Sequence, residues 1–243
     1  MRLSINELET LARKAAVGAG VDHGHALEAA RALVWLCATG TACLPGFVAA
    51  LNAWWRGETG TVVSSGDESM LVLGTADERP ACPFYAAPAA RDFAGTVVQG
   101  RAFRRIKVVN VVQPCLVLAR LALDQSIGNV HIQCLEPGTT RVRWDALRPQ
   151  TAPGSGSTVI GDVLDDRSAD ILLDPLPALA VEAGGSTRTR HRLAPGMEHL
   201  FARGVAVDTG TLEALKGFYE LTLVPDSHAS RRHGAGAGLV DSD

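Results

Sequence analysis

The chain has 243 residues, of which 47% are hydrophobic and 20% charged, a composition typical of a globular protein with one large domain or two small ones. This composition excludes a disordered chain, a collagen-like repeat and a disulfide scaffold. The formal charge is −3, from 23 Lys and Arg against 26 Asp and Glu. The protein therefore has no overall basic field, and we expect no nucleic acid partner.

The first part of the chain has the pattern of three helices. Residues Ser4–Glu7 match the S-x-x-E capping box, and Gly18–Gly20 ends the helix that follows. A second helix is expected over residues 22–40, with Asp22 as its cap, and a third over residues 45–57, with Pro45 in its first turn.

Beyond this unit, short apolar runs bounded by Gly, Pro and Asp indicate strands. These runs are residues 70–73, 96–98, 106–112, 130–135, 141–144 and 171–173. Residues 114–124 are Leu- and Ala-rich and favour a crossover helix that opens at Pro114, which would make residues 106–135 a strand–helix–strand unit. A last helix is expected to begin at Asp208 or Thr209.

The predicted fold class is α+β (mixed α/β), with an N-terminal helical unit, a central sheet with a crossover helix, a C-terminal helix and a Gly-rich tail. We divide the chain into a helical unit at residues 1–57, a mixed α/β body at 58–225 with a loop at 149–158, and a tail at 226–243. We expect these parts to form one compact domain.

The five cysteines are odd in number and show no C-x-x-C spacing, so we expect buried, reduced thiols and a reducing compartment. The N-terminus lacks the apolar core of a signal peptide. The most apolar stretch, residues 108–123, includes Asn110, Gln113 and Arg120 and is shorter than the ~20 residues that span a bilayer. We therefore predict a cytoplasmic protein without a membrane partner.

Metal binding has weak candidates in His191 and His199, which Pro195 and Gly196 separate and which could converge across a turn. No third ligand is visible nearby, so the sequence predicts no confident metal site.

The tail is the most unusual segment, with the sequence SHASRRHGAGAGLVDSD at residues 227–243. Alternating glycines allow successive backbone N–H groups to form an anion-binding nest, and the arginines can pair with a carboxylate or phosphate. The candidate ligand-binding residues are Ser230, Arg231, Arg232, Gly234, Gly236 and Gly238, and the catalytic candidates are Asp241 and Asp243. The alternative is a disordered terminus, which is common for segments rich in Gly and small polar residues.

Both ends of the chain resemble a bacterial family known as domain of unknown function 3726. The opening motif is S-x-x-E-x-x-x-x-A-x-K-A-A-x-G-A-G at residues 4–20, and the closing motif is V-P-x-S-x-x-S-R-x-x-G-A-G-A-G-x-x-D-x-D at residues 224–243. The D-S-D ending departs from the D-N-D associated with that family. The fixed closing pattern implies a docked tail, and the family brings no activity with it.

The first ~55 residues are also similar to the N-terminal segment of the malate/L-lactate dehydrogenase type 2 family. The resemblance implies a fold that is not Rossmann-like, and enzymes of that family bind NAD(P) and use a histidine in a Ser-His-Gly motif for hydride chemistry. The matching stretch here is Cys43-Leu44-Pro45-Gly46, and Ala49 or Ala50 stands where an arginine is expected. Leucine and proline cannot carry the proton that accompanies hydride transfer, so the cofactor stays unassigned and NAD(P) is not expected.

Two classes of function remain open. The clustering of arginine, glycine and aspartate favours an enzyme or binding protein for a small anionic metabolite, with its site formed by the tail. The lack of a legible acid/base pair elsewhere favours a non-catalytic accessory protein, either a homo-oligomer or bound to a partner protein, or a degenerate relative of the NAD(P)-dependent malate/lactate-type dehydrogenases. The sequence names neither the substrate nor the reaction.

Overall fold

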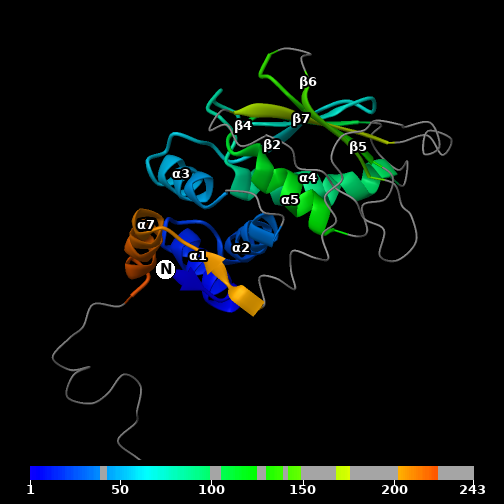
Figure 1. Cartoon of the computed structure of the whole chain (residues 1–243). Coiled ribbons are helices and arrows are strands. Elements are labelled where there is room, and N and C mark those ends of the chain that lie inside the picture. Colours follow the sequence, from blue (N-terminus) through cyan, green and yellow to red (C-terminus); the bar gives the residue numbers. More distant parts are fainter. Residues whose placement is uncertain are drawn as a thin grey trace, which may run out of the picture.

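The structure is a computed structural model, and it describes residues 1–38, 43–98, 105–124, 130–138, 142–148, 168–175 and 202–223. Within these residues the helices lie on one side of a six-stranded sheet (Figure 1). The predicted loop at 149–158 and the tail at 226–243 lie outside the described residues.

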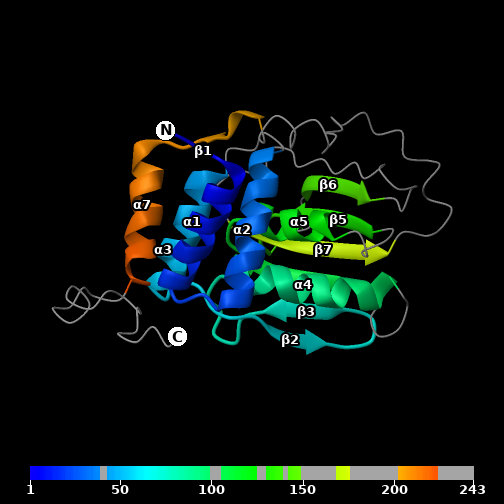
Figure 2. The ribbon, with the colours of Figure 1, turned by 90° about the horizontal axis from the view of Figure 1, so that it is seen from below.

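Four helices form a unit that lies away from the sheet. They are α1 (Ile5–Gly18), α2 (His23–Ala38), α3 (Leu44–Trp55) and α7 (Thr209–Glu220). The first three confirm the predicted N-terminal helices, and α7 packs against α1 and α3 (Figure 2). The strands β1 (Arg2–Leu3) and β8 (Val205–Ala206) pair antiparallel and hold the two ends of this unit together.

Local capping explains where two of these helices begin. Ser4 and Glu7 form the predicted capping box, in which each side chain bonds the backbone N–H of the other residue. The Asp208 carboxylate accepts a hydrogen bond from the Thr211 N–H at 2.9 Å, so Asp208 is the cap of α7 and Thr209 its first residue.

The large sheet is mixed. Its strands are β2 (Val63–Gly66), β3 (Leu71–Gly74), β4 (Ile106–Val111), β5 (Val130–Leu135), β6 (Val142–Arg148) and β7 (Ala169–Pro175). Their order is β2-β3-β4-β7-β5-β6, and among these pairs only β3 and β4 are parallel. The predicted strand–helix–strand unit is present, but β7 lies antiparallel between β4 and β5, so those two strands share a direction without being neighbours.

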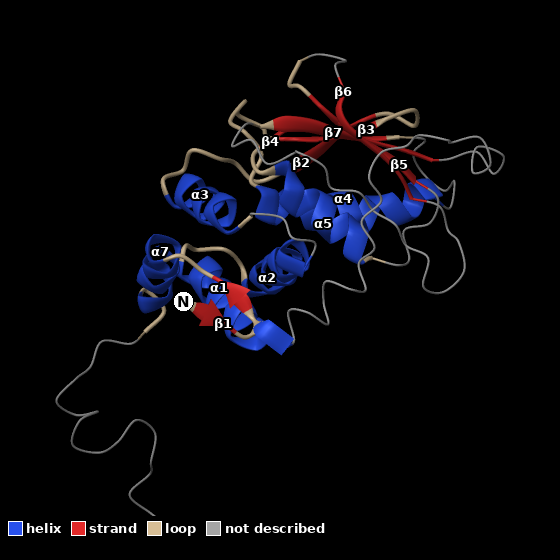
Figure 3. Ribbon diagram, in the orientation of Figure 1, coloured by secondary structure: helices blue, strands red, loops and turns tan. Residues whose placement is uncertain are grey.

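The sheet register places one row of apolar residues across four strands. Leu71 pairs with Ile106, Ile106 with Leu173, and Leu173 with Ile132, and all four side chains are buried. This face is covered by α4 (Pro83–Val98) and α5 (Pro114–Leu123), as Figure 3 shows. The predicted strand at 96–98 is wrong, because buried residues at helical spacing such as Phe84, Ala87, Ala90 and Ala94 continue α4 through the locally β-prone Thr-Val-Val run.

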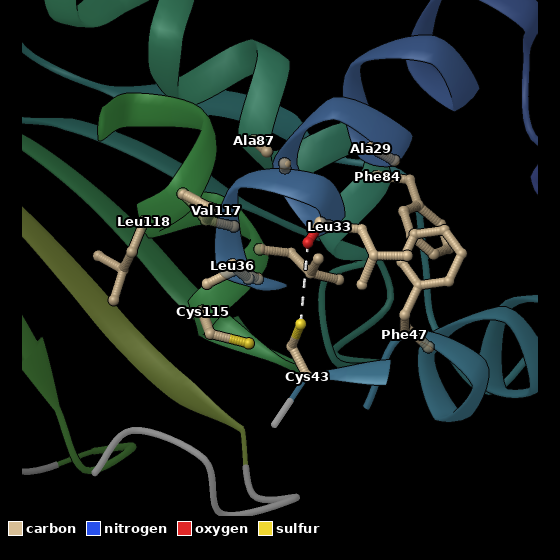
Figure 4. Close-up of a cluster of buried hydrophobic side chains, with 14 of the residues drawn as sticks. Ala29, Leu33, Leu36, Cys43, Phe47, Phe84, Ala87, Cys115, Val117 and Leu118 are labelled. Carbon is tan, nitrogen blue, oxygen red and sulfur yellow. Dashed lines mark hydrogen bonds between the residues drawn. The ribbon is translucent and has the colours of Figure 1, made fainter. Parts of the chain in front are cut away.

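Helix α2 connects the helical unit to the sheet layer. It packs against α1 on one side and against α4 and α5 on the other. Its Leu33 and Leu36 are fully buried, and Phe47 of α3 meets Phe84 of α4 edge to face with ring centroids 5.5 Å apart (Figure 4). The predicted mixed α and β class is thus confirmed. None of the described helices is long and apolar enough to cross a membrane.

Candidate functional site

The first turns of α3 and α5 meet at Gly46 and Gln113. Gly46 lies one residue after Pro45 in the first turn of α3, and Gln113 is the residue that precedes α5. A Cβ atom on Gly46 would overlap Gln113 Oε1 and would lie 3.0 Å from Gln113 Cδ. Gly46 therefore leaves room for the amide of Gln113, whose side chain is buried.

The turn between β4 and α5 has unusual backbone geometry. Asn110 and Gln113 have positive φ angles of 50° and 47°, a left-handed conformation that non-glycine residues adopt at a cost. Hydrogen bonds hold the turn in place, since the Asn110 N–H donates to Asp170 Oδ1 at 2.7 Å and the Ala81 N–H donates to the Asn110 carbonyl at 2.9 Å. The carboxyl end of β4 is thus held by Asp170 of β7 and by Ala81, which precedes α4.

Asp170, which bonds the Asn110 N–H, is a buried charge beside the end of β4. It lies in β7 with 1% of its surface exposed, and its Oδ2 pairs with Lys107 Nζ on β4 at 2.9 Å. This ion pair compensates both charges, which a buried carboxylate requires. Gly46, Asn110 and Gln113 are referred to below as the β4–α5 turn site. Lys107 and Asp170 alternate with Ile106 and Ile171, so their pair lies on the sheet face opposite the one that α4 and α5 cover.

The N-termini of α3 and α5 carry positive partial charge. Neither α3 nor α5 has an acidic residue in its first turn, and neither N-cap side chain makes a capping hydrogen bond. A helix N-terminus attracts anions through its unpaired N–H groups and its dipole. Two such ends in contact favour a negatively charged ligand.

Three residues at the starts of α3 and α5 are poorly suited to proton transfer. Leu44 is buried and aliphatic, and a glutamine amide does not titrate near neutral pH. Burial raises the pKa of Cys115, next to Pro114, to about 12, so this thiol stays protonated and is a poor nucleophile. Leu44, Gln113 and Cys115 thus supply no acid/base chemistry, and the titratable groups Lys107 and Asp170 on the adjoining strands pair with each other.

Comparison with known proteins supports both predicted resemblances. Residues 3–70 match the model of DUF3726, a family of unknown function. The match covers the opening motif and not the closing one. A comparison with curated protein sequences gave no match.

Solved structures show a similar fold over almost the whole chain. Malate dehydrogenase from Entamoeba histolytica has a TM-score of 0.57 at 9% identity, with 93% of this chain and 99% of that chain covered. A dehydrogenase from Sinorhizobium meliloti has a TM-score of 0.60 at 13% identity, with 90% and 99% covered. Sulfolactate dehydrogenase from Methanocaldococcus jannaschii has a TM-score of 0.57 at 11% identity, with 92% and 98% covered. At these identities the likeness shows the fold alone.

The site residues predicted from the sequence are not tested by the structure, and their roles stay predictions. The tail candidates and the two histidines lie outside the described residues: His191, His199, Ser230, Arg231, Arg232, Gly234, Gly236, Gly238, Asp241 and Asp243. Among the described residues no group of three or more His, Cys, Asp or Glu side chains could hold a metal ion.

Sequence reasoning did not identify the β4–α5 turn site. Asn110 and Gln113 counted only as polar interruptions of an apolar stretch. The available signal was their position, because Asn110 lies near the carboxyl end of β4 and Gln113 directly precedes Pro114, where α5 begins. Ligands of α/β proteins bind preferentially at the carboxyl ends of strands.

Proposed function

We propose that the protein binds a small anionic metabolite on a scaffold of the malate/lactate dehydrogenase type and is a degenerate relative that does not transfer hydride. The observation that carries this proposal is the contact between two helix N-termini without acidic first turns, at Gly46 and Gln113. Two of the similar structures are dehydrogenases of malate and of sulfolactate. A small 2-hydroxy acid is therefore the first ligand to test.

The residues present do not fit the nicotinamide chemistry that the family resemblance implies. Reduction of a carbonyl by hydride needs a proton donor at the oxygen that becomes the hydroxyl. Leu44 and Pro45 stand where the resemblance places a histidine, and Leu44 is buried in the core. No reaction step through a nicotinamide follows from this arrangement.

The tail supplies what the β4–α5 turn site lacks, in this proposal. Lys107 is already paired with Asp170, so a fully charged anion needs a further cation. Arg231 and Arg232 are the proposed source, with the backbone of residues 234–238 as additional donors. Arg231 lies eight residues after Leu223, and an extended segment of that length reaches roughly 26 Å.

The proposal is tested by thermal unfolding with and without millimolar malate, lactate, sulfolactate and inorganic phosphate. At least one anion should raise the melting temperature of the wild type, since a ligand at 100 times its Kd adds about 2.7 kcal/mol to the unfolding free energy. The shift should be lost in Gln113→Ala and kept in Gln133→Ala, which changes a partly buried glutamine on β5.

A second measurement addresses hydride transfer. The protein is mixed with NADH or NADPH and with oxaloacetate or pyruvate, and absorbance is followed. We expect no oxidation of the nicotinamide. Measurable turnover would overturn the non-catalytic half of the proposal, and the absence of any anion-dependent shift would overturn the binding half and favour the accessory-protein alternative.

A further inference from the structure

Two thiols lie next to each other where α2 ends and α3 begins. The Sγ atoms of Cys37 and Cys43 are 3.7 Å apart. A disulfide has an S–S distance of about 2.0 Å, so less than 2 Å of movement separates this contact from a covalent bond. All five cysteines lie in the described residues and none forms a disulfide, as the sequence predicts.

The two thiols differ in exposure and in hydrogen bonding. Cys37 is half-buried, whereas Cys43 is buried and its Sγ lies 3.9 Å from the Leu33 carbonyl oxygen, the dashed line in Figure 4. The contact with the Cys43 thiol lowers the pKa of Cys37, and the same contact raises the pKa of Cys43. Such asymmetry is typical of a dithiol in which one sulfur attacks and the other resolves.

We propose that Cys37 and Cys43 form a reversible redox-active dithiol that a small disulfide, such as glutathione disulfide, oxidises. The other three cysteines are buried, which limits access to their sulfur atoms. In a reducing compartment, disulfides are mostly transient and sensory, which suits a pair that is close together but reduced.

The proposed reaction is two successive thiol–disulfide exchanges. The Cys37 thiolate attacks one sulfur of the oxidant and forms a mixed disulfide, and the expelled thiolate takes up the proton that Cys37 has lost. Cys43 then gives up its proton and attacks Cys37 Sγ, which releases the second small thiol. The protein loses two protons and two electrons, and the oxidant takes up both and leaves as two thiols.

Oxidation would act on the start of α3. Cys43 is the N-cap of that helix, so a bond to Cys37 draws its first turn toward α2 and disturbs the contact with the Leu33 carbonyl. The same turn carries Gly46, which packs on Gln113. The redox chemistry stands without the proposed function, but its effect on anion binding rests on that function.

The test uses the full-length protein in buffers of reduced and oxidised glutathione at several ratios, followed by alkylation, tryptic digestion and mass spectrometry. Cys37 and Cys43 lie on one tryptic peptide, residues 32–56, so their disulfide appears as that unalkylated peptide, lighter than its dithiol form by two hydrogens. We expect alkylatable thiols to fall from five to three as the oxidised fraction rises, and reduction to restore all five.

Single variants separate this pair from other thiols. Cys43→Ser should stop the reaction at the mixed disulfide and retain glutathione on Cys37, whereas Cys37→Ser should retain none. Cys82→Ser is the matched control, because burial raises the pKa of that thiol to about 12 and it lies outside the pair, so its variant should still form the disulfide. The proposal is overturned if all five thiols of the wild type stay alkylatable, or if the disulfide that forms contains Cys115, whose side chain also lies beside Cys43 in Figure 4.

Discussion

At the scale of single residues, the β4–α5 turn combines features that are costly for stability. Asn110 and Gln113 adopt left-handed backbone conformations, each at a cost of order 1–3 kcal/mol. Asp170 places a carboxylate in the core, where it needs the partner that Lys107 provides. Costly geometry that neighbouring elements hold in place is often found at ligand sites, which is why this turn carries the proposed function.

The first prediction concerns Gly46→Ala. The new methyl group would overlap the buried Gln113 amide, so we expect a loss of about 1–3 kcal/mol in unfolding free energy and a loss of the anion-dependent thermal shift. Gly24→Ala is the matched control, since a Cβ there meets no heavy atom within 4 Å. Both free energies are measured by urea unfolding.

The double variant Gly46→Ala/Gln113→Ala tests the physical cause. Removal of the amide should relieve the overlap, so the double variant should be more stable than the sum of the two single effects predicts. If the two effects add, Gly46 does not act through Gln113.

At the scale of elements, the sequence predicts those helix boundaries that depend on residues close together in the chain. The capping box at Ser4 and the cap at Asp208 predict the helix starts correctly, because their hydrogen bonds join residues only three positions apart in the sequence. The sheet order could not be predicted, since the insertion of β7 between β4 and β5 depends on pairing distant in sequence. The same limit hid the candidate site, because Gly46 and Gln113 meet only after α3 and α5 have packed.

The second prediction tests the packing of α1 on α7. A Cβ on Gly18 would overlap the Phe218 carbonyl oxygen and lie 2.7 Å from its carbon, and this backbone cannot move without shifting α7. Gly18→Ala should therefore cost about 1–3 kcal/mol in unfolding free energy. Gly217→Ala, on α7 itself, meets no heavy atom within 4 Å and should instead add up to about 1 kcal/mol through helix propensity. Equal effects of the two variants would show that α1 and α7 are not in close contact.

At the scale of the whole molecule, the fold is similar to those of solved dehydrogenases, while Leu44 and Pro45 stand where the sequence resemblance places a histidine. The fold depends on apolar positions that α2 shares with both layers, and these positions tolerate different side chains of similar volume. Proton transfer depends on one titratable group in one place, which a substitution such as leucine for histidine removes at once. A shared fold at 9–13% identity is therefore compatible with a changed function.

The last prediction addresses the tail. Deletion of residues 234–243 should abolish the anion-dependent thermal shift and leave the melting temperature without ligand almost unchanged. The shift should be lost because the segment supplies backbone N–H donors to the ligand. The melting temperature should change little because Leu239 and Val240 are its only large apolar residues and can add little buried surface. Differential scanning fluorimetry of both proteins, with and without the stabilising anion, measures the two quantities together. A truncated protein that fails to fold would make the tail a structural element. One that binds the anion as tightly as the full chain would exclude residues 234–243 from the site, since Arg231 and Arg232 are still present.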